Sequence, residues 1–106
     1  PNPSELLQSR AMATTIGTLR EEYDAVIFDG APVIAVTDAA IIANQVDGTV
    51  LVIRSKQVPR DVALHAKDLL EQANARLLGV VLNGVLPQEQ KNYQYYYYYQ
   101  DNAERA

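Results

Sequence analysis

Short runs of uninterrupted apolar residues alternate along the chain with longer segments in which apolar residues recur every three or four positions. The uninterrupted runs cover residues 25–28, 49–53 and 77–82, and their shortness, branched side chains and lack of polar alternation are typical of strands buried on both faces. The segments with helical spacing cover residues 3–22, 39–45 and 59–74, which predicts three helices. The order α-β-α-β-α-β therefore predicts an α/β fold in which helices sandwich a parallel sheet.

The first predicted helix begins with a capping pattern. Asn2 can cap the helix, Pro3 suits its first position, and Glu5 stands where a capping box places an acidic residue. The apolar stripe that we expect to face the core consists of Leu6, Met12, Ile16, Leu19 and Tyr23.

The character of the chain changes after Leu86. Gln, Asn, Glu and Lys surround a cluster of tyrosines, with almost no aliphatic residue, and such a segment cannot form a core of its own. We therefore expect residues 1–86 to form the folded body and residues 87–106 to form a flexible, disordered tail. The clustered tyrosines are Tyr93, Tyr95, Tyr96, Tyr97, Tyr98 and Tyr99.

Composition excludes several classes of function. The 106 residues carry a formal charge of −4, which is the wrong sign for a domain that binds nucleic acid by neutralising phosphates. Cysteine is absent and His65 is the single histidine, so neither a disulfide framework nor a histidine-rich metal site is expected. The apolar runs are too short to span a bilayer.

Polar residues follow each predicted strand, namely Asp29, Arg54 and Asn83. Ligands of open parallel sheets bind at the carboxyl ends of strands, so these three are the candidate site residues. An aspartate directly after an apolar strand is the Walker B arrangement, which holds Mg²⁺; the alternative is that Asp29 caps a loop. Arg54 could contact phosphates, although a surface ion pair is favoured. Asp38 is favoured as a helix cap over a second metal ligand, and His65 as a solvated side chain.

Three separated pieces together resemble one family. Residues 1–7, residues 23–32 followed by Thr37-Asp38-Ala39, and the terminal tyrosine cluster closely resemble the cytoplasmic kinase domain of bacterial protein-tyrosine kinases, which accompany capsule and exopolysaccharide export. The resemblance covers essentially the whole chain.

The resemblance implies a P-loop nucleotide fold that uses ATP and Mg²⁺ to phosphorylate the tyrosine cluster. Asp29 and Pro32 match the family's Walker B pattern, whereas Gly30 and Ala31 stand where the family more often has a hydroxyl residue and a second proline. Asn83 lies where related ATPases approach the adenine, and an amide can pair with a purine edge. A role as a turn former in Asn83-Gly84 is equally open.

Two motifs that the family requires are absent from residues 1–106. These are the phosphate-binding G-x-x-x-x-G-K-[ST] loop and a strand followed by Asp-x-Asp, and we expect both upstream of Pro1, in a longer protein of which this chain is a piece. The piece alone is expected to be inactive. In this class of sheet the strand leading to the phosphate loop lies between the Walker B strand and the strand 49–53, so we expect a central gap and a marginal fold.

The resemblance also implies partners. Family members exchange tails between subunits of a ring-like homo-oligomer, and they reach the cytoplasmic face of the inner membrane through their own spanning helices or through a membrane activator protein. A cognate tyrosine phosphatase is a further expected partner. Two alternatives to the kinase function stay open, a partition-type P-loop ATPase and a non-catalytic interaction module with a tyrosine-rich tail.

Overall fold

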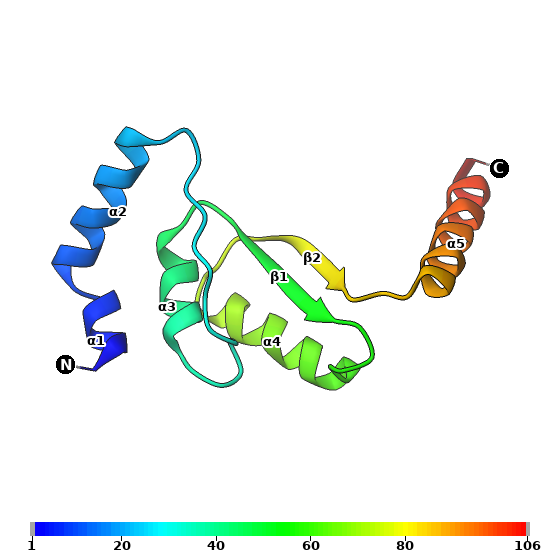
Figure 1. The fold of residues 1–106 in the computed structure, drawn as a ribbon, viewed down its shortest axis with the longest axis horizontal. Helices are drawn as coiled ribbons and strands as arrows, with labels where there is room; N and C mark the ends of the chain where they lie inside the picture. Colours follow the sequence, from blue (N-terminus) through cyan, green and yellow to red (C-terminus); the bar gives the residue numbers. More distant parts are fainter. Residues whose placement is uncertain (1, 106) are drawn as a thin grey trace.

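The computed structural model describes residues 2–105, which form five helices and two strands (Figure 1). In chain order these are α1 (Pro3–Leu7), α2 (Arg10–Glu22), α3 (Asp38–Gln45), β1 (Thr49–Arg54), α4 (Arg60–Gln72), β2 (Leu77–Asn83) and α5 (Pro87–Arg105). The molecule is elongated, with extents of 52 × 30 × 25 Å. The predicted α/β class is thus confirmed in a small form, two parallel strands flanked by helices.

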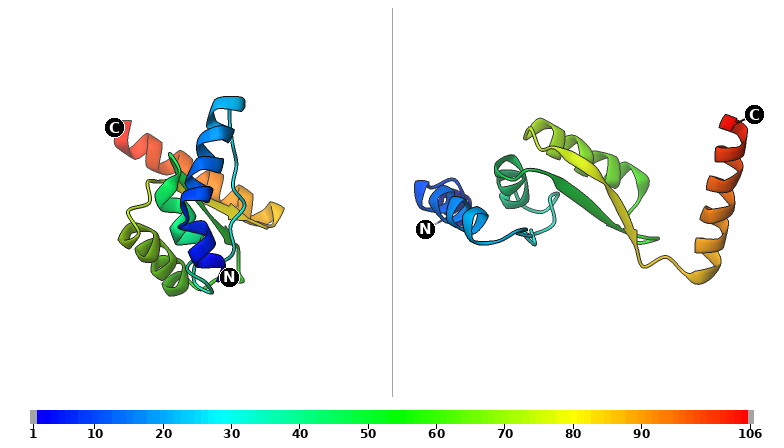
Figure 2. Two further views of the ribbon diagram at one scale, coloured as in Figure 1. Left: turned by 90° about the vertical axis from the view of Figure 1, so that its left-hand side faces the viewer. Right: turned by 90° about the horizontal axis from the view of Figure 1, so that it is seen from above.

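Strands β1 and β2 pair in parallel, as the two apolar runs predicted, and α4 connects them. The register places Leu51 opposite Val80 and Arg54 opposite Asn83. Helix α4 lies alongside this pair (Figures 1 and 2). Along β1, half-buried residues alternate with exposed ones, so one face of the strand is covered. The expectation of strands covered on both faces is wrong for the described residues, because no helix covers the second face.

The core is small, and among the described residues its buried side chains come from α2, α3 and α4. Its buried side chains are Ile16, Ala43, Ala66 and Leu70. Ala66 and Leu70 stand four positions apart on α4, where a helix presents both residues to the same side. Three of the predicted stripe positions of the first helix, Ile16 with the half-buried Met12 and Leu19, do face inward. Leu6 and Tyr23 are exposed, which corrects the prediction at both ends of the stripe.

The single helix predicted over residues 3–22 is divided in two. Asn2 caps α1 as expected by accepting the backbone N–H of Ser4 at 3.0 Å. Ser9 then ends this helix, since its hydroxyl donates to the carbonyl of Leu6 at 2.6 Å and accepts the N–H of Met12 at 3.1 Å. A serine that caps a new helix competes with helix continuation, and this accounts for the break.

The predicted strand 25–28 is extended but is not part of the sheet, which has two strands among the described residues. Its apolar side chains are not all buried: Ile27 is 93% exposed. A strand requires a backbone partner, and between residues 24 and 31 none of the described backbone groups makes a hydrogen bond to β1. The run therefore has the composition of a strand without its pairing.

The tail is helical, which corrects the expectation of a disordered segment. Helix α5 covers 19 residues and projects from the rest of the molecule (Figures 1 and 2). Pro87 occupies its first position, and the Glu89 carboxylate accepts the N–H of Leu86 at 3.2 Å. This is the acidic half of a capping box. A salt bridge from Glu89 to Lys56 joins the start of α5 to the turn after β1. No helix among residues 2–105 is long and apolar enough to cross a membrane.

Candidate functional site

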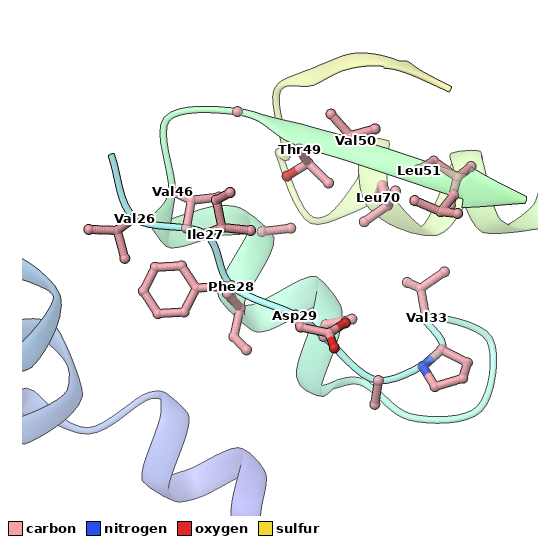
Figure 3. Close-up of a pocket in the computed structure, with 18 residues that line it drawn as sticks. Val26, Ile27, Phe28, Asp29, Val33, Val46, Thr49, Val50, Leu51 and Leu70 are labelled. Carbon is pink, nitrogen blue, oxygen red and sulfur yellow. The ribbon is translucent and has the colours of Figure 1, made fainter. Parts of the chain in front are cut away.

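Asp29 lies within the extended segment 24–32, where its side chain lines a cavity (Figure 3). The carboxylate is exposed, and the following Gly30 passes close to α3, with Ala39 3.4 Å from the position that a Cβ on Gly30 would occupy. No hydrogen bond ties this carboxylate to another described residue. The alternative of a loop-capping aspartate therefore receives no support, and the carboxylate is available to a ligand.

The cavity has a volume of about 660 Å³. One wall is the extended segment 26–33, and the opposite wall is Gly48 followed by the first four residues of β1. The floor includes Ala43 of α3 and Leu70 of α4, and Figure 3 shows Leu70 below β1. Apart from Asp29 and Thr49, the lining side chains are apolar. The cavity lies where the sequence predicts a gap between the Walker B segment and the next strand.

Arg54 and Asn83 lie opposite one another at the carboxyl ends of β1 and β2. Both side chains are exposed, and neither lines the cavity that contains Asp29. Of the three predicted site residues, Arg54 and Asn83 are therefore neighbours, whereas Asp29 lies at a separate place. Within the described part of the chain Arg54 forms no ion pair, which corrects the favoured expectation of surface pairing. Gly84 has a φ of +71°, a left-handed conformation suited to glycine. This supports the turn-forming role of Asn83-Gly84.

Asp38 occupies the first position of α3, and the N-cap is Thr37. The Asp38 carboxylate accepts a hydrogen bond of 2.8 Å from the Ser4 hydroxyl, and an acid in the first turn also suits the positive end of the helix dipole. Asp38 is thus a helix-terminus residue, although not the cap itself. Ser4 was not predicted, because a contact across 34 residues of sequence leaves no local signal. His65 is exposed on α4, as predicted.

The described residues contain no group of three or more acidic or histidine side chains that could hold a metal ion by themselves. Mg²⁺ is commonly held by one or two carboxylates together with waters and substrate phosphates. The exposed Asp29 carboxylate fits the role of one such ligand. The remaining ligands would come from water and from a bound nucleotide.

The exposed tyrosines of α5 include one directly bonded pair. The hydroxyls of Tyr95 and Tyr99 lie 3.0 Å apart, and their rings meet edge to face with centroids 4.7 Å apart. The hydrogen bond with Tyr95 raises the pKa of Tyr99 above its usual value of 10.0. The side chains of Tyr97 and Tyr98 are exposed too, and those of Tyr93 and Tyr96 lie outside the described residues.

Sequence reasoning missed the residues that attach this helix to the body. Lys56 has a left-handed backbone, with a φ of 63°, in the turn that follows β1. Its ammonium group lowers the pKa of Glu89 through a hydrogen bond, and the Leu86 N–H acts in the same direction. Pro87 with an acidic residue two positions later was the available signal for a helix start, which the polar composition of the tail obscured.

No protein-family profile matches the chain. Among curated proteins, the tyrosine-protein kinase YwqD of Bacillus subtilis is 42% identical over 96 residues, which cover 91% of this chain and 40% of YwqD. The putative tyrosine-protein kinase CapB of Staphylococcus aureus is 42% identical over 99 residues, which cover 93% of this chain and 42% of CapB. This chain therefore spans about two fifths of the length of these relatives.

The solved structures include a similar fold. The crystal structure of the VpsO kinase domain superposes with a TM-score of 0.74 at 33% sequence identity. The match covers 80% of this chain and 42% of the VpsO domain. Sequence and fold comparisons therefore agree that the chain is similar to tyrosine-protein kinases and spans about two fifths of the proteins that it matches.

Proposed function

Because the chain belongs to the family of bacterial tyrosine-protein kinases of capsule and exopolysaccharide systems and corresponds to part of the kinase domain, we propose that the complete protein is an ATP-dependent autokinase that phosphorylates the tyrosines of α5. The main observation behind this proposal is that one short chain combines two features. One is the Asp29 carboxylate, which has no hydrogen-bond partner among the described residues, and the other is a projecting helix with exposed tyrosines. A partition-type ATPase would leave the tyrosines unexplained, and a non-catalytic interaction module would leave the Asp29 carboxylate unexplained.

Asp29 has the role of a magnesium ligand in this proposal. Bound Mg²⁺ would neutralise charge on the phosphates of ATP during transfer. The residues of this chain orient the carboxylate: the extended segment carries it to the cavity, and the close approach of Gly30 to α3 fixes the turn that follows. Asn83 and Arg54 remain candidates for contacts to the nucleotide base and phosphates at the carboxyl ends of the strands.

The tyrosine hydroxyls are the proposed phosphate acceptors. A phenol with a pKa near 10 is a weak nucleophile and needs a nearby group that accepts its proton. Helix α5 lies far from the segment that carries Asp29 (Figure 1), and we propose that its tyrosines are modified by a neighbouring subunit. This arrangement supports transfer between copies in a homo-oligomer.

The decisive experiment compares Asp29→Asn with Asp24→Asn in the complete protein. Both positions are exposed in the same extended segment, but only Asp29 lines the cavity. Phosphopeptide mass spectrometry of the tail should show a loss on the order of 100-fold for Asp29→Asn, because even residues that only orient a metal ligand are worth about 10- to 100-fold in metal affinity or activity, and near wild-type phosphorylation for Asp24→Asn. Equal phosphorylation in the two variants would remove Asp29 from the chemistry.

Phosphorylation of the tail is proposed to control assembly. Each phosphate adds a charge of about −1.5 to −2 at neutral pH, so several phosphates on the cluster would repel a site that contains Asp29. Replacing the six clustered tyrosines by glutamate should favour dissociated subunits of the complete kinase, and replacing them by phenylalanine should favour the oligomer. Identical oligomer sizes by light scattering would contradict this mechanism.

In the cell we place the complete protein at the cytoplasmic face of the inner membrane, in polysaccharide synthesis and export. A membrane activator region or protein would bring it there, and a cognate tyrosine phosphatase would reverse the modification. Co-purification of the complete kinase with membranes, lost on removal of the activator, tests this placement.

A further inference from the structure

We propose that Lys56 is a positioning residue for phosphorylation of the tail: its ion pair with Glu89 sets the direction of α5 and so presents the tyrosines to a neighbouring subunit. The inference deepens the proposed function and rests on it for the identity of the reaction. Three features of the structure support it, namely the way α5 joins the body, the turn that carries Lys56, and the backbone conformation of this lysine.

The first feature is that α5 joins the body through a short connection. Figure 1 and the right-hand view of Figure 2 show α5 leading away from the end of β2, with its later turns far from the strands. The connection consists of residues 84–86 and begins at Gly84, whose φ is +71°. Because glycine permits many backbone conformations, this connection does not by itself fix the direction of the helix.

The Glu89 carboxylate supplies a further contact with both of its oxygen atoms. Oε1 pairs with the Lys56 ammonium group, and Oε2 accepts the N–H of Leu86 at 3.2 Å. One carboxylate therefore ties the first turn of α5 both to the connection before it and to the turn after β1. A contact to two separate segments restricts how the helix can tilt.

The second feature is that the turn carrying Lys56 is itself bonded to the sheet. Ser55 donates its N–H to the carbonyl of Asn83 on β2 at 2.8 Å, and Val58 donates its N–H to the carbonyl of Arg54 on β1 at 3.2 Å. The Lys56 ammonium group thus extends from a turn that hydrogen bonds tie to both strands. Its ion pair transmits the orientation of the sheet to α5.

The third feature is the backbone of Lys56, which has a φ of 63°. This left-handed conformation is unfavourable for a residue with a Cβ, and glycine or asparagine usually occupies it. Unfavourable backbone conformations cluster where a residue has a function. What lysine offers here beyond glycine is its ammonium group, and that group contacts Glu89.

A small tilt at the start of α5 has a large effect at the tyrosines. Tyr99 lies about 15 Å along the helix from Glu89, so a tilt of about 20° at Glu89 would move Tyr99 by about 5 Å. Reacting atoms need to approach within about 3–3.5 Å of one another. Holding the direction of α5 in advance therefore favours transfer, because less orientation is lost when the subunits meet.

The first measurement follows the direction of α5 and does not require phosphate transfer. Nitroxide labels replace His65 on α4 and Gln94 on α5, both of which are exposed, in complete protein diluted with unlabelled subunits. The distribution of distances between the labels should be narrow in the wild type and in Lys56→Arg, which keeps the charge. It should be clearly broader in Lys56→Gln.

Lys67→Gln is the matched control, because Lys67 forms an ion pair with Glu71 at 3.6 Å within α4. This variant loses the same charge from a comparable pair and should keep the narrow distribution. A distribution in Lys56→Gln as narrow as that of the wild type would overturn the proposal.

The second measurement separates the two roles of a subunit. Subunits with Asp29→Asn act as phosphate acceptors, and subunits with all six clustered tyrosines replaced by phenylalanine act as donors. Lys56→Gln in the acceptor should lower the initial rate of tail phosphorylation about fivefold, the scale of an exposed ion pair. The same change in the donor should leave the rate within about twofold, and so should Lys56→Arg or Lys67→Gln in the acceptor.

A general structural fault in Lys56→Gln would lower the rate from either side. An equal loss in the donor, or an unchanged rate in the acceptor, would therefore overturn the positioning role. If no mixture transfers phosphate although Lys56→Gln broadens the distance distribution, the ion pair stands as the anchor of α5 and the proposed function is wrong.

Discussion

Truncating Leu70 should reveal how much of the fold depends on its small core. Leu70 is 3% exposed and lies on α4 beneath β1, where it also forms part of the cavity floor. Leu64 on the same helix is 49% exposed and supplies a control with the same chemistry and the same helix propensity. The comparison of Leu70→Ala with Leu64→Ala therefore isolates burial from every other property of a leucine.

The expected magnitude follows from the surroundings of each side chain. Leucine-to-alanine changes in closed cores cost about 2–5 kcal/mol, because the lost burial is increased by the cavity that remains. Leu70 already borders open space, so some of its contacts are missing, and the expected cost is about 2 kcal/mol, at the lower end of that range. Leu64 loses little burial, and its replacement should cost under about 0.5 kcal/mol.

Hydrogen exchange of the β1–β2 amides is the suitable assay, since it reports local opening free energies even where global unfolding is not a single sharp transition. Protection of the Leu51 and Ile53 amides should fall on the order of 30-fold in Leu70→Ala, which corresponds to about 2 kcal/mol. These amides should keep their protection in Leu64→Ala. Equal losses in the two variants would refute the packing argument.

Two further predictions concern the ends of helices. Asn74 adopts a φ of 59° after α4, with Ala75 donating its N–H to the carbonyl of Leu70 at 3.0 Å. Asn74→Ala should therefore cost about 1 kcal/mol and Asn74→Gly should not, as measured by urea unfolding; identical midpoints for both would contradict the left-handed cap. The second concerns acid. Because the folded-state pKa of Glu89 lies below its ordinary 4.5, its contribution to the start of α5 is complete above that pH and is lost as the pH falls through the lowered pKa. The Leu86 amide shift in NMR should follow this step, which Glu89→Gln should abolish, and persistence of the step in that variant would assign it to another group.

The elements that sequence patterns predicted well are those whose partners lie within the chain. Runs 49–53 and 77–82 became β1 and β2 with boundaries shifted by one residue, because each finds the other across α4. The helix predicted over 59–74 became Arg60–Gln72, since its apolar stripe packs on that same pair. Local pattern and tertiary contact agree in this β-α-β unit.

Predictions failed where the required partner is missing or where a local competitor was overlooked. The run 25–28 has strand composition, yet composition cannot supply the neighbouring backbone that a strand needs. Ser9 divides the first helix by capping a second one, a signal that apolar periodicity does not contain. For α5, we predicted a disordered tail from the polar composition of the segment and overlooked the helix-start pattern of Pro87 and Glu89.

The sequence predicted which residues belong to the candidate site, but it did not predict how these residues are arranged in space. Asp29 could be identified from the apolar run before it, and its exposed carboxylate beside a cavity agrees with that identification. Its separation from Arg54 and Asn83 could not be foreseen. We expected Asp29, Arg54 and Asn83 to lie close together at one edge of the sheet. That arrangement requires a central strand, which would fix the distance between the two sides of the cavity.

The helical form of the tail restricts how its tyrosines can be met. Successive residues of an α-helix are rotated by about 100°, so Tyr97, Tyr98 and Tyr99 face three different directions, and a single approaching surface meets one of them at a time. Tyr95 returns to nearly the same direction as Tyr99, with which it shares a hydrogen bond. Complete modification would thus require either repeated re-docking at new angles or transient unwinding of this helix, and the order in which the phenols are modified would record which route is taken.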